Sequence, residues 1–158
     1  MNISENELKT QVQKIRQKLF IIRDKRFHPA KDDKILTNWN GLMIAALAKA
    51  AHILRNPKYI EAAQQATKFI FKCLIREDGR LLHRSRDGDA AILANADDYA
   101  FLIWGLIELY ETTFDISYLE KALNLQEEMI KYFWNREDGG FYFTSDDGEM
   151  VLFRQKEI

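Results

Sequence analysis

The chain alternates between helical segments that are apolar on nearly every side and helical segments that are apolar on one side only. Residues about 40–55 and 98–113 are of the first kind, because few polar residues interrupt them. Residues about 58–76 and 117–134 are of the second kind, with apolar residues at helical spacing and charged residues between them. A helix that is apolar all round must be covered on all sides, whereas a one-sided helix leaves a face to water. The pattern therefore predicts two inner helices, each followed by an outer helix.

These two helix pairs form an internal repeat. Leu42 matches Leu102, and the Glu-Asp-Gly sequence of residues 77–79 returns at residues 137–139, an offset of 60 in both cases. A further helix is predicted at about residues 5–25, before the first pair, with apolar residues three and four positions apart. Repeated helix pairs of this period predict an all-α fold, in which αα-hairpins form part of an α/α barrel or toroid. We expect all 158 residues to form one incomplete toroid segment.

The connections within each helix pair are short, and the connection between the pairs is long. The long loops therefore gather at the face where the inner helices begin, which is where function is expected on a rigid scaffold. Two loop segments, at about residues 80–86 and 140–154, are strand-like pieces that lie between Asp-Gly turns. They predict short β-hairpin-like loops on this face.

Composition excludes several classes of function. With 23 basic and 24 acidic residues and no basic stripe, the chain is not expected to bind nucleic acid. No apolar run is long enough to cross a membrane, and the first residues lack the pattern of a secretory signal, so we expect a cytoplasmic protein. Cys73 is the only cysteine, which excludes a CxxC motif within this sequence.

We predict no cofactor and no metal. The glycines form no phosphate-binding loop, and the three histidines show no metal-ligand spacing. His28 and His83 are expected in loops, unpaired with any acid at metal-ligand spacing, and His52 at the end of an apolar helix.

Acids, amides and aromatic residues are concentrated just before the two inner helices. Adjacent helices pack about 8–10 Å apart. Asp33 and Asp98 could therefore reach the separation of about 6.5–9.5 Å that inverting glycoside hydrolysis requires. We predict these two residues as the catalytic pair. The predicted substrate-binding residues, which would offer flat rings and hydrogen-bonding groups to a sugar, are Asp32, Trp39, Asn40, Asp97 and Tyr99.

A structural explanation of the same residues stays open. Asp and Asn at helix starts are ordinary N-cap residues, so Asp97 and Asp98 can be caps. The Asp32–Asp33 doublet can be a solvated turn, and Trp39 can be a packing residue.

Three strings resemble a known family. They are KILTNWNGLMIAALAKA at residues 34–50, preceded by Asp32–Asp33, DDYA at residues 97–100, and GGFYFT at residues 139–144. They resemble the thioredoxin-domain-containing, spermatogenesis-associated protein-like family, over about residues 19–158. The resemblance implies an all-α (α/α)6 toroid, a helical ring of six hairpins similar to the six-hairpin glycosidases and the N-acylglucosamine 2-epimerases. It implies carbohydrate processing by the full-length protein, either glycoside hydrolysis or sugar epimerisation. No histidine lies in a matching motif, so the resemblance assigns none to catalysis.

The resemblance also implies that this chain is an internal segment. Its partners would be the remaining hairpins and a thioredoxin-like domain of the parent protein, and the segment by itself is expected to be inactive. The alternative is a non-catalytic binding or scaffold module that accompanies the thioredoxin-like domain. An unclosed toroid exposes apolar flanks, so we expect a homo-oligomer that packs through faces containing Met43, Leu47, Ile103 and Ile107.

Overall fold

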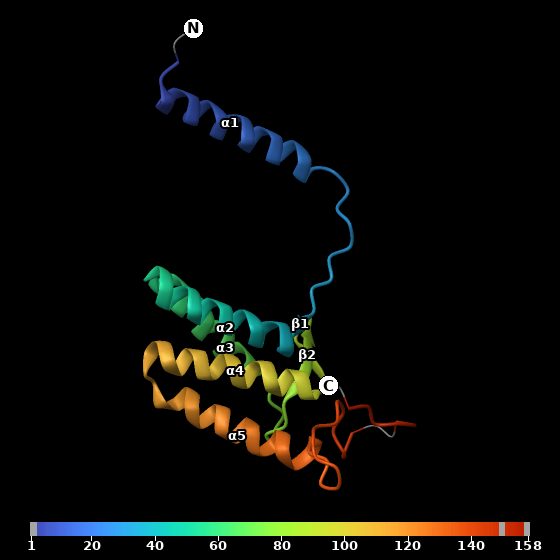
Figure 1. The fold of residues 1–158 in the computed structure, drawn as a ribbon. Helices are drawn as coiled ribbons and strands as arrows, with labels where there is room; N and C mark the ends of the chain where they lie inside the picture. Colours follow the sequence, from blue (N-terminus) through green and yellow to red (C-terminus); the bar gives the residue numbers. More distant parts are fainter. Residues whose placement is uncertain (1–2, 149–150, 157–158) are drawn as a thin grey trace. The chain divides into compact units, whose positions relative to one another are not determined.

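The structure is a computed structural model that describes residues 3–148 and 151–156, and within these residues it is mostly helical (Figure 1). The helices are α1 (Glu5–Asp24), α2 (Thr37–Leu54), α3 (Pro57–Cys73), α4 (Ala96–Thr113) and α5 (Ile116–Phe133). The strands are β1 (Ile35–Leu36), β2 (Leu82–Arg86) and β3 (Asp89–Leu93). The prediction of an all-α fold built from αα-hairpins is confirmed. No described helix is both long enough and apolar enough to span a membrane.

The chain divides into two compact units, Met1–Asp33 and Lys34–Ile158. The first unit contains α1, which begins at a capping box: the Ser4 N–H donates to the Glu7 carboxylate, and the Glu7 N–H donates to the Ser4 hydroxyl. None of the residues of α1 is buried. That all 158 residues form one toroid segment stays a prediction.

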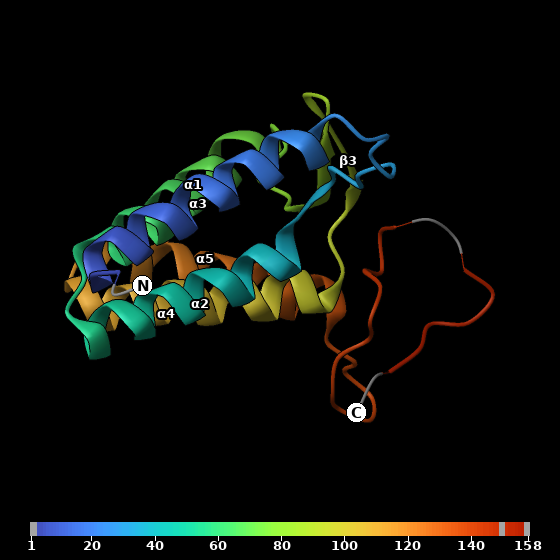
Figure 2. The same cartoon turned by 90° about the horizontal axis from the view of Figure 1, so that it is seen from above.

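In the second unit, α2 and α4 lie side by side as an inner layer, and α3 and α5 cover it (Figure 2). The inner helices bury six residues each, whereas the outer helices bury three each. The buried residues of the inner helices include Ile44, Ala48, Leu102 and Leu106, all 0% exposed. The inner and outer roles predicted from the hydrophobic pattern are confirmed.

The two inner helices run parallel and approach closely at two glycines. A Cβ atom on Gly41 would lie 2.6 Å from the backbone of Phe101 and Leu102, and one on Gly105 would lie 2.8 Å from the Gly41 carbonyl oxygen. Further along the pair, the Thr112 hydroxyl lies 3.3 Å from the Ala48 carbonyl oxygen. Only glycine permits so close a backbone approach, so these residues set the separation of α2 and α4.

The hairpin turns explain where the helices begin and end. α2 and α4 each end at a residue in the left-handed conformation, Arg55 with φ 50° and Phe114 with φ 55°. The outer helices then begin at N-caps: the Asn56 side chain accepts from the Lys58 N–H, and the Asp115 side chain accepts from the Ser117 N–H. The inner helices begin two to three residues earlier than predicted, at Thr37 and Ala96.

The small sheet has the antiparallel order β1-β2-β3. β2 and β3 are joined by Asp87–Gly88, which both have positive φ, as a tight hairpin turn requires. The strand-like piece predicted near residues 80–86 is β2. β1 and β3 were not predicted, because neither lies between two Asp-Gly turns. The strand-like loop predicted at about residues 140–154 contains no regular strand in its described part, and residues 149–150 lie outside it. It forms an isolated bridge from Trp134 to Phe141, and the Phe143 N–H donates to the Gln155 carbonyl oxygen (2.8 Å). The Arg154 guanidinium donates to the Thr144 and Tyr132 carbonyl oxygens.

Candidate functional site

Asp98, in the first turn of α4, is the centre of a hydrogen-bonded cluster. Its side chain is 0% exposed. One carboxylate oxygen accepts from the Asn38 N–H at the start of α2 (2.9 Å). The other accepts from the Asn95 N–H (2.8 Å) and lies 2.8 Å from Nδ1 of His83. Asp98 therefore joins the beginnings of both inner helices to strand β2.

The structure pairs His83 with Asp98, an acid that does not stand at metal-ligand spacing from it in the sequence. His83 lies on β2, and the β2–β3 hairpin brings the chain back so that residue 83 lies beside residue 98. The β2–β3 pairing holds at Leu82 and at Arg84 but skips His83, whose counterpart in register, Ile92, has the unusual φ of 68°. Apart from the Asp-Gly turn, no local signal identifies which residue of this hairpin meets the acid. Sequence reasoning missed this pair for that reason.

The pair has the geometry of a positioned acid–base group. Burial raises the pKa of Asp98, and the Asn95 N–H and His83 act against that rise by favouring the carboxylate. An ionised carboxylate can only accept hydrogen bonds, so it holds the proton of a neutral His83 on Nδ1. The imidazole is 23% exposed, and no hydrogen bond to Nε2 is found among the described residues. His83 can therefore present a basic nitrogen to a ligand while Asp98 fixes its tautomer.

Asn38, Asp97 and Trp39 form the rim of this cluster. The Asn38 Nδ2 group donates to Asp97 (2.8 Å), and Asn38 Oδ1 accepts from the Trp39 N–H (2.7 Å). Asp97 is half-buried, whereas Trp39 is 67% exposed. Trp39 thus offers a free aromatic ring next to the bonded amide. Asn40, by contrast, uses its side-chain amide to bind the Leu36 carbonyl oxygen (2.8 Å) and closes the first turn of α2.

The prediction that Tyr99 lines a substrate site is wrong. Tyr99 is 0% exposed and packs on Phe133, with ring centroids 5.3 Å apart. Its hydroxyl accepts from the Leu81 N–H (3.3 Å) and donates to the Glu128 carboxylate (3.2 Å). Because α4 turns by about 100° per residue, Asp98 faces the polar cluster while its neighbour faces the core.

Asp32 and Asp33 are exposed residues of the unit that ends at residue 33, whereas Asp98 lies in the unit that begins at Lys34. A catalytic pair of Asp33 and Asp98 therefore stays a prediction. Asp98 also has no exposed surface through which it could touch a substrate itself.

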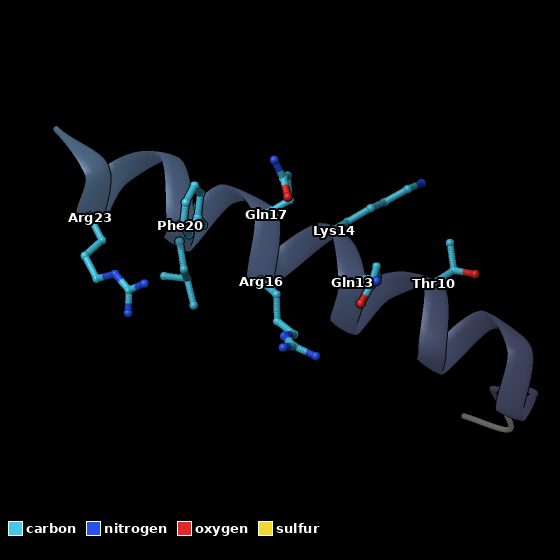
Figure 3. Close-up of a pocket in the computed structure, with 8 residues that line it drawn as sticks. Thr10, Gln13, Lys14, Arg16, Gln17, Phe20 and Arg23 are labelled. Carbon is cyan, nitrogen blue, oxygen red and sulfur yellow. The ribbon is translucent and has the colours of Figure 1, made fainter. Parts of the chain in front are cut away.

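A hollow along α1 carries no candidate site. Figure 3 shows that its lining comes from this one helix, and its side chains project outward from the ribbon. A single helix cannot enclose a ligand, so this hollow is a gap between neighbouring exposed side chains. The lining residues are Thr10, Gln13, Lys14, Arg16, Gln17, Leu19, Phe20 and Arg23.

No family model matches the chain. The chain is 37% identical to an uncharacterised protein of Caenorhabditis elegans, over 98% of this chain and 22% of that protein. It is 34% identical to spermatogenesis-associated protein 20 of Homo sapiens, over 82% of this chain and 18% of that protein. The chain thus spans about a fifth of the length of the curated relatives it matches.

Several solved structures with a similar fold carry the names of enzymes that act on carbohydrates. They include cellobiose 2-epimerase from Bacillus thermoamylovorans, 18% identical with a TM-score of 0.68, which matches 79% of this chain and is itself covered to 33%. D-mannose isomerase is 16% identical with a TM-score of 0.64, over 72% of this chain and 31% of that one. An α-mannanase from Bacteroides thetaiotaomicron is 18% identical with a TM-score of 0.63, over 92% and 45%. These likenesses show the six-hairpin toroid fold.

Proposed function

We propose that this chain contributes a carbohydrate-processing site, in which His83 transfers a proton to and from a sugar and the buried Asp98 orients it. The observation that carries the proposal is the 2.8 Å contact between a wholly buried carboxylate and a part-exposed imidazole at the face where the inner helices begin. The fold supports a sugar as the substrate, because its structural neighbours include sugar epimerases, an isomerase and a glycosidase.

The geometry favours proton transfer at carbon over two-carboxylate hydrolysis. Asp98 is enclosed and already accepts from two N–H groups, so it is poorly placed to protonate a glycosidic oxygen. Histidine titrates near neutral pH and suits removal of a proton next to a carbonyl group. In that step Nε2 of His83 takes the C2 proton of an open-chain aldose, and the electron pair passes to the carbonyl oxygen. Return of the proton to the opposite face of C2 gives the epimer. Its return to C1, while the O2 proton passes to O1, gives the ketose, so this reading supports epimerisation or isomerisation.

Trp39 and Asp97 are the accompanying ligand-binding candidates. An exposed indole offers a flat apolar surface for the C–H face of a sugar ring. Asp97 already accepts from Asn38 and keeps further acceptor capacity for a sugar hydroxyl.

The site is tested by NMR titration of the chain with mannose and with cellobiose. We expect both sugars to move the His83 ring resonances, and to leave those of His52, an exposed histidine of α2, in place. The matched variants are His83→Gln, which should abolish sugar binding, and His52→Gln, which should not. Equal shifts at both histidines, or none at either, would refute the site.

The reaction is tested in deuterated water by following the C2–H signal of mannose. Deuterium uptake with the wild type but not with His83→Gln supports epimerisation or isomerisation. Asp98→Asn should lower kcat and shift its pH profile with little change in KM, because the amide no longer fixes the imidazole tautomer.

A binding or scaffold module is the second candidate, and one observation favours it. Asp98 caps its own helix through Asn95 and caps α2 through Asn38, which is a sufficient structural reason for an acid at this position. In that case sugars would leave the His83 resonances unchanged, and Asp98→Ala would cost stability alone, by at least the ~1 kcal/mol of a lost cap.

A further inference from the structure

Thr37, the first residue of α2, lies opposite His83 where the small sheet meets the inner layer. The antiparallel β1–β2 ladder ends with the pair Leu36 and Arg84. The next position in this register brings residue 37 opposite residue 83, and there the chain turns into α2. The backbone ladder therefore stops just before the imidazole, and the side chain of Thr37 is the group that continues the contact between α2 and β2.

The Thr37 hydroxyl donates to the Leu82 carbonyl oxygen (2.6 Å), which belongs to the peptide group that leads into His83. Thr37 is 0% exposed, so water does not compete for its hydroxyl. The hydroxyl does not cap its own helix, because the N-cap residue of α2 is Leu36. The Leu82 N–H donates to the Leu74 carbonyl oxygen (2.8 Å). Residue 82 is therefore held through both its N–H and its carbonyl oxygen.

The next residue of α2, Asn38, holds the acid of the same pair. Its N–H donates to one Asp98 oxygen (2.9 Å), and the other Asp98 oxygen lies 2.8 Å from Nδ1 of His83. Two consecutive residues in the first turn of α2 thus hold the two members of the pair, Thr37 on the side of the base and Asn38 on the side of the acid. A site of this kind depends on such supporting bonds to keep its geometry.

We propose that Thr37 is a positioning residue of the site, whose hydroxyl holds β2 so that Nδ1 of His83 stays within hydrogen-bonding distance of Asp98. The inference rests on the proposed function of His83, but the state of the imidazole can be measured without any sugar. Without the hydroxyl, β2 is free to move away from α2, whereas Asn38 keeps Asp98 in place. The carboxylate then no longer selects one tautomer, and a neutral imidazole divides between the two.

Nitrogen NMR of the chain labelled at histidine distinguishes the protonated from the unprotonated ring nitrogen, and the spectrum of His83→Gln assigns the signals. At a pH at which the ring is neutral, we expect the wild type to carry its proton on Nδ1 alone. Thr37→Val keeps the shape of the buried side chain but lacks the hydroxyl, so it should show both tautomers. Thr37→Ser returns the hydroxyl and should restore the single tautomer.

Thr67→Val is the matched control. Thr67 is 2% exposed, and its hydroxyl also donates to a backbone carbonyl oxygen, that of Ala63 within α3 (2.9 Å). This variant loses a buried hydroxyl of the same kind at a distance from the site, so the tautomer of His83 should not change. The wild type supplies a measurement that needs no folded variant: the Thr37 hydroxyl proton should exchange slowly with water, and rapid exchange overturns the proposal.

Deuterium uptake by mannose separates this inference from the proposed reaction. Thr37→Val should lower kcat about tenfold with little change in KM, because a small displacement of the base slows the reaction without removing a contact to the sugar. Thr67→Val should change neither value. A wild type without uptake, together with mixed tautomers in Thr37→Val, refutes the reaction but supports the role of Thr37. A Thr37→Val protein with the wild-type tautomer overturns that role, even where His83 is the base.

Discussion

The close approach of α2 and α4 makes Gly41→Ala the most informative single substitution. The new Cβ would lie 2.6 Å from Leu102 N and from the Phe101 carbonyl carbon, and 2.8 Å from the Phe101 oxygen. An ordinary carbon contact needs about 3.5 Å, so the helices must separate by roughly 0.9 Å. The atoms met are backbone atoms, which no rotamer change can move aside.

The change in the free energy of unfolding combines two costs, overpacking and lost attraction between atoms, with one gain in helix propensity. Overpacking typically costs about 1–3 kcal/mol, and the rigid backbone contact places this site at the upper end. A gap of 0.5–1 Å also forfeits about a quarter to a half of the attraction between neighbouring atoms, here those of Ile44 and Leu106. Replacing a helical glycine by alanine returns about 1 kcal/mol. We therefore expect a net loss of about 2 kcal/mol, or roughly 4–8 °C in Tm for a domain of this size.

Urea unfolding of wild type and variant at one fixed protein concentration measures this loss. Ala46→Gly, on the exposed side of the same helix, measures the difference in helix propensity between glycine and alanine without any change in packing, and it should cost about 1 kcal/mol. The substitution should also move the His83 resonances, because the bond from the Asn38 N–H to Asp98 crosses the same helix pair. A Gly41→Ala protein as stable as the wild type would refute the close backbone approach.

Three further outcomes are expected. Burial raises the pKa of Glu108, but Lys49 at 2.6 Å and the Trp104 indole outweigh it and lower the pKa below its ordinary 4.5. The ionised Glu108 carboxylate therefore stabilises the folded state above pH 4.5, and this stabilisation is lost as pH falls through the lowered pKa. Unfolding curves should show Glu108→Gln destabilised at neutral pH and equal to wild type in strong acid. Ile92→Gly should raise the free energy of unfolding by about 0.5–1 kcal/mol, because relief of the left-handed conformation (about 1–2 kcal/mol) exceeds the entropy cost of glycine; an unchanged or lower value would contradict it. Asp115→Ala should cost about 1 kcal/mol in thermal melts through loss of the cap on α5, and Asp115→Asn much less.

The helices and their layers were predictable because the signal for them is local. Residues three and four positions apart share a helix face, and the spread of apolar residues around the helix reports how many sides are covered. The placement of polar groups at the beginnings of α2 and α4 was predictable for the same reason, since helix order and loop length bring those ends to one face. Asp97 and Asp98 do lie there, bonded to Asn38 of the neighbouring helix.

The chemistry of the cluster depended on contacts between distant residues. His83 meets Asp98 because a two-residue turn sets the register of β2 against β3, and a shift of one position would have turned His83 to the other face. Tyr99 is buried because of the rotation of α4 about its axis, which packing against α2 and Phe133 determines.

The amino-acid sequence by itself determined which segments are helical, which of them are covered, and which ends carry acids, because these properties follow from the spacing of neighbouring residues. Only the tertiary structure decided that Asp98 is enclosed, that His83 is its partner and that Tyr99 is buried in the core. The reason is physical: burial and acid–base pairing depend on distances between residues remote in the chain, which helix packing and strand register establish together.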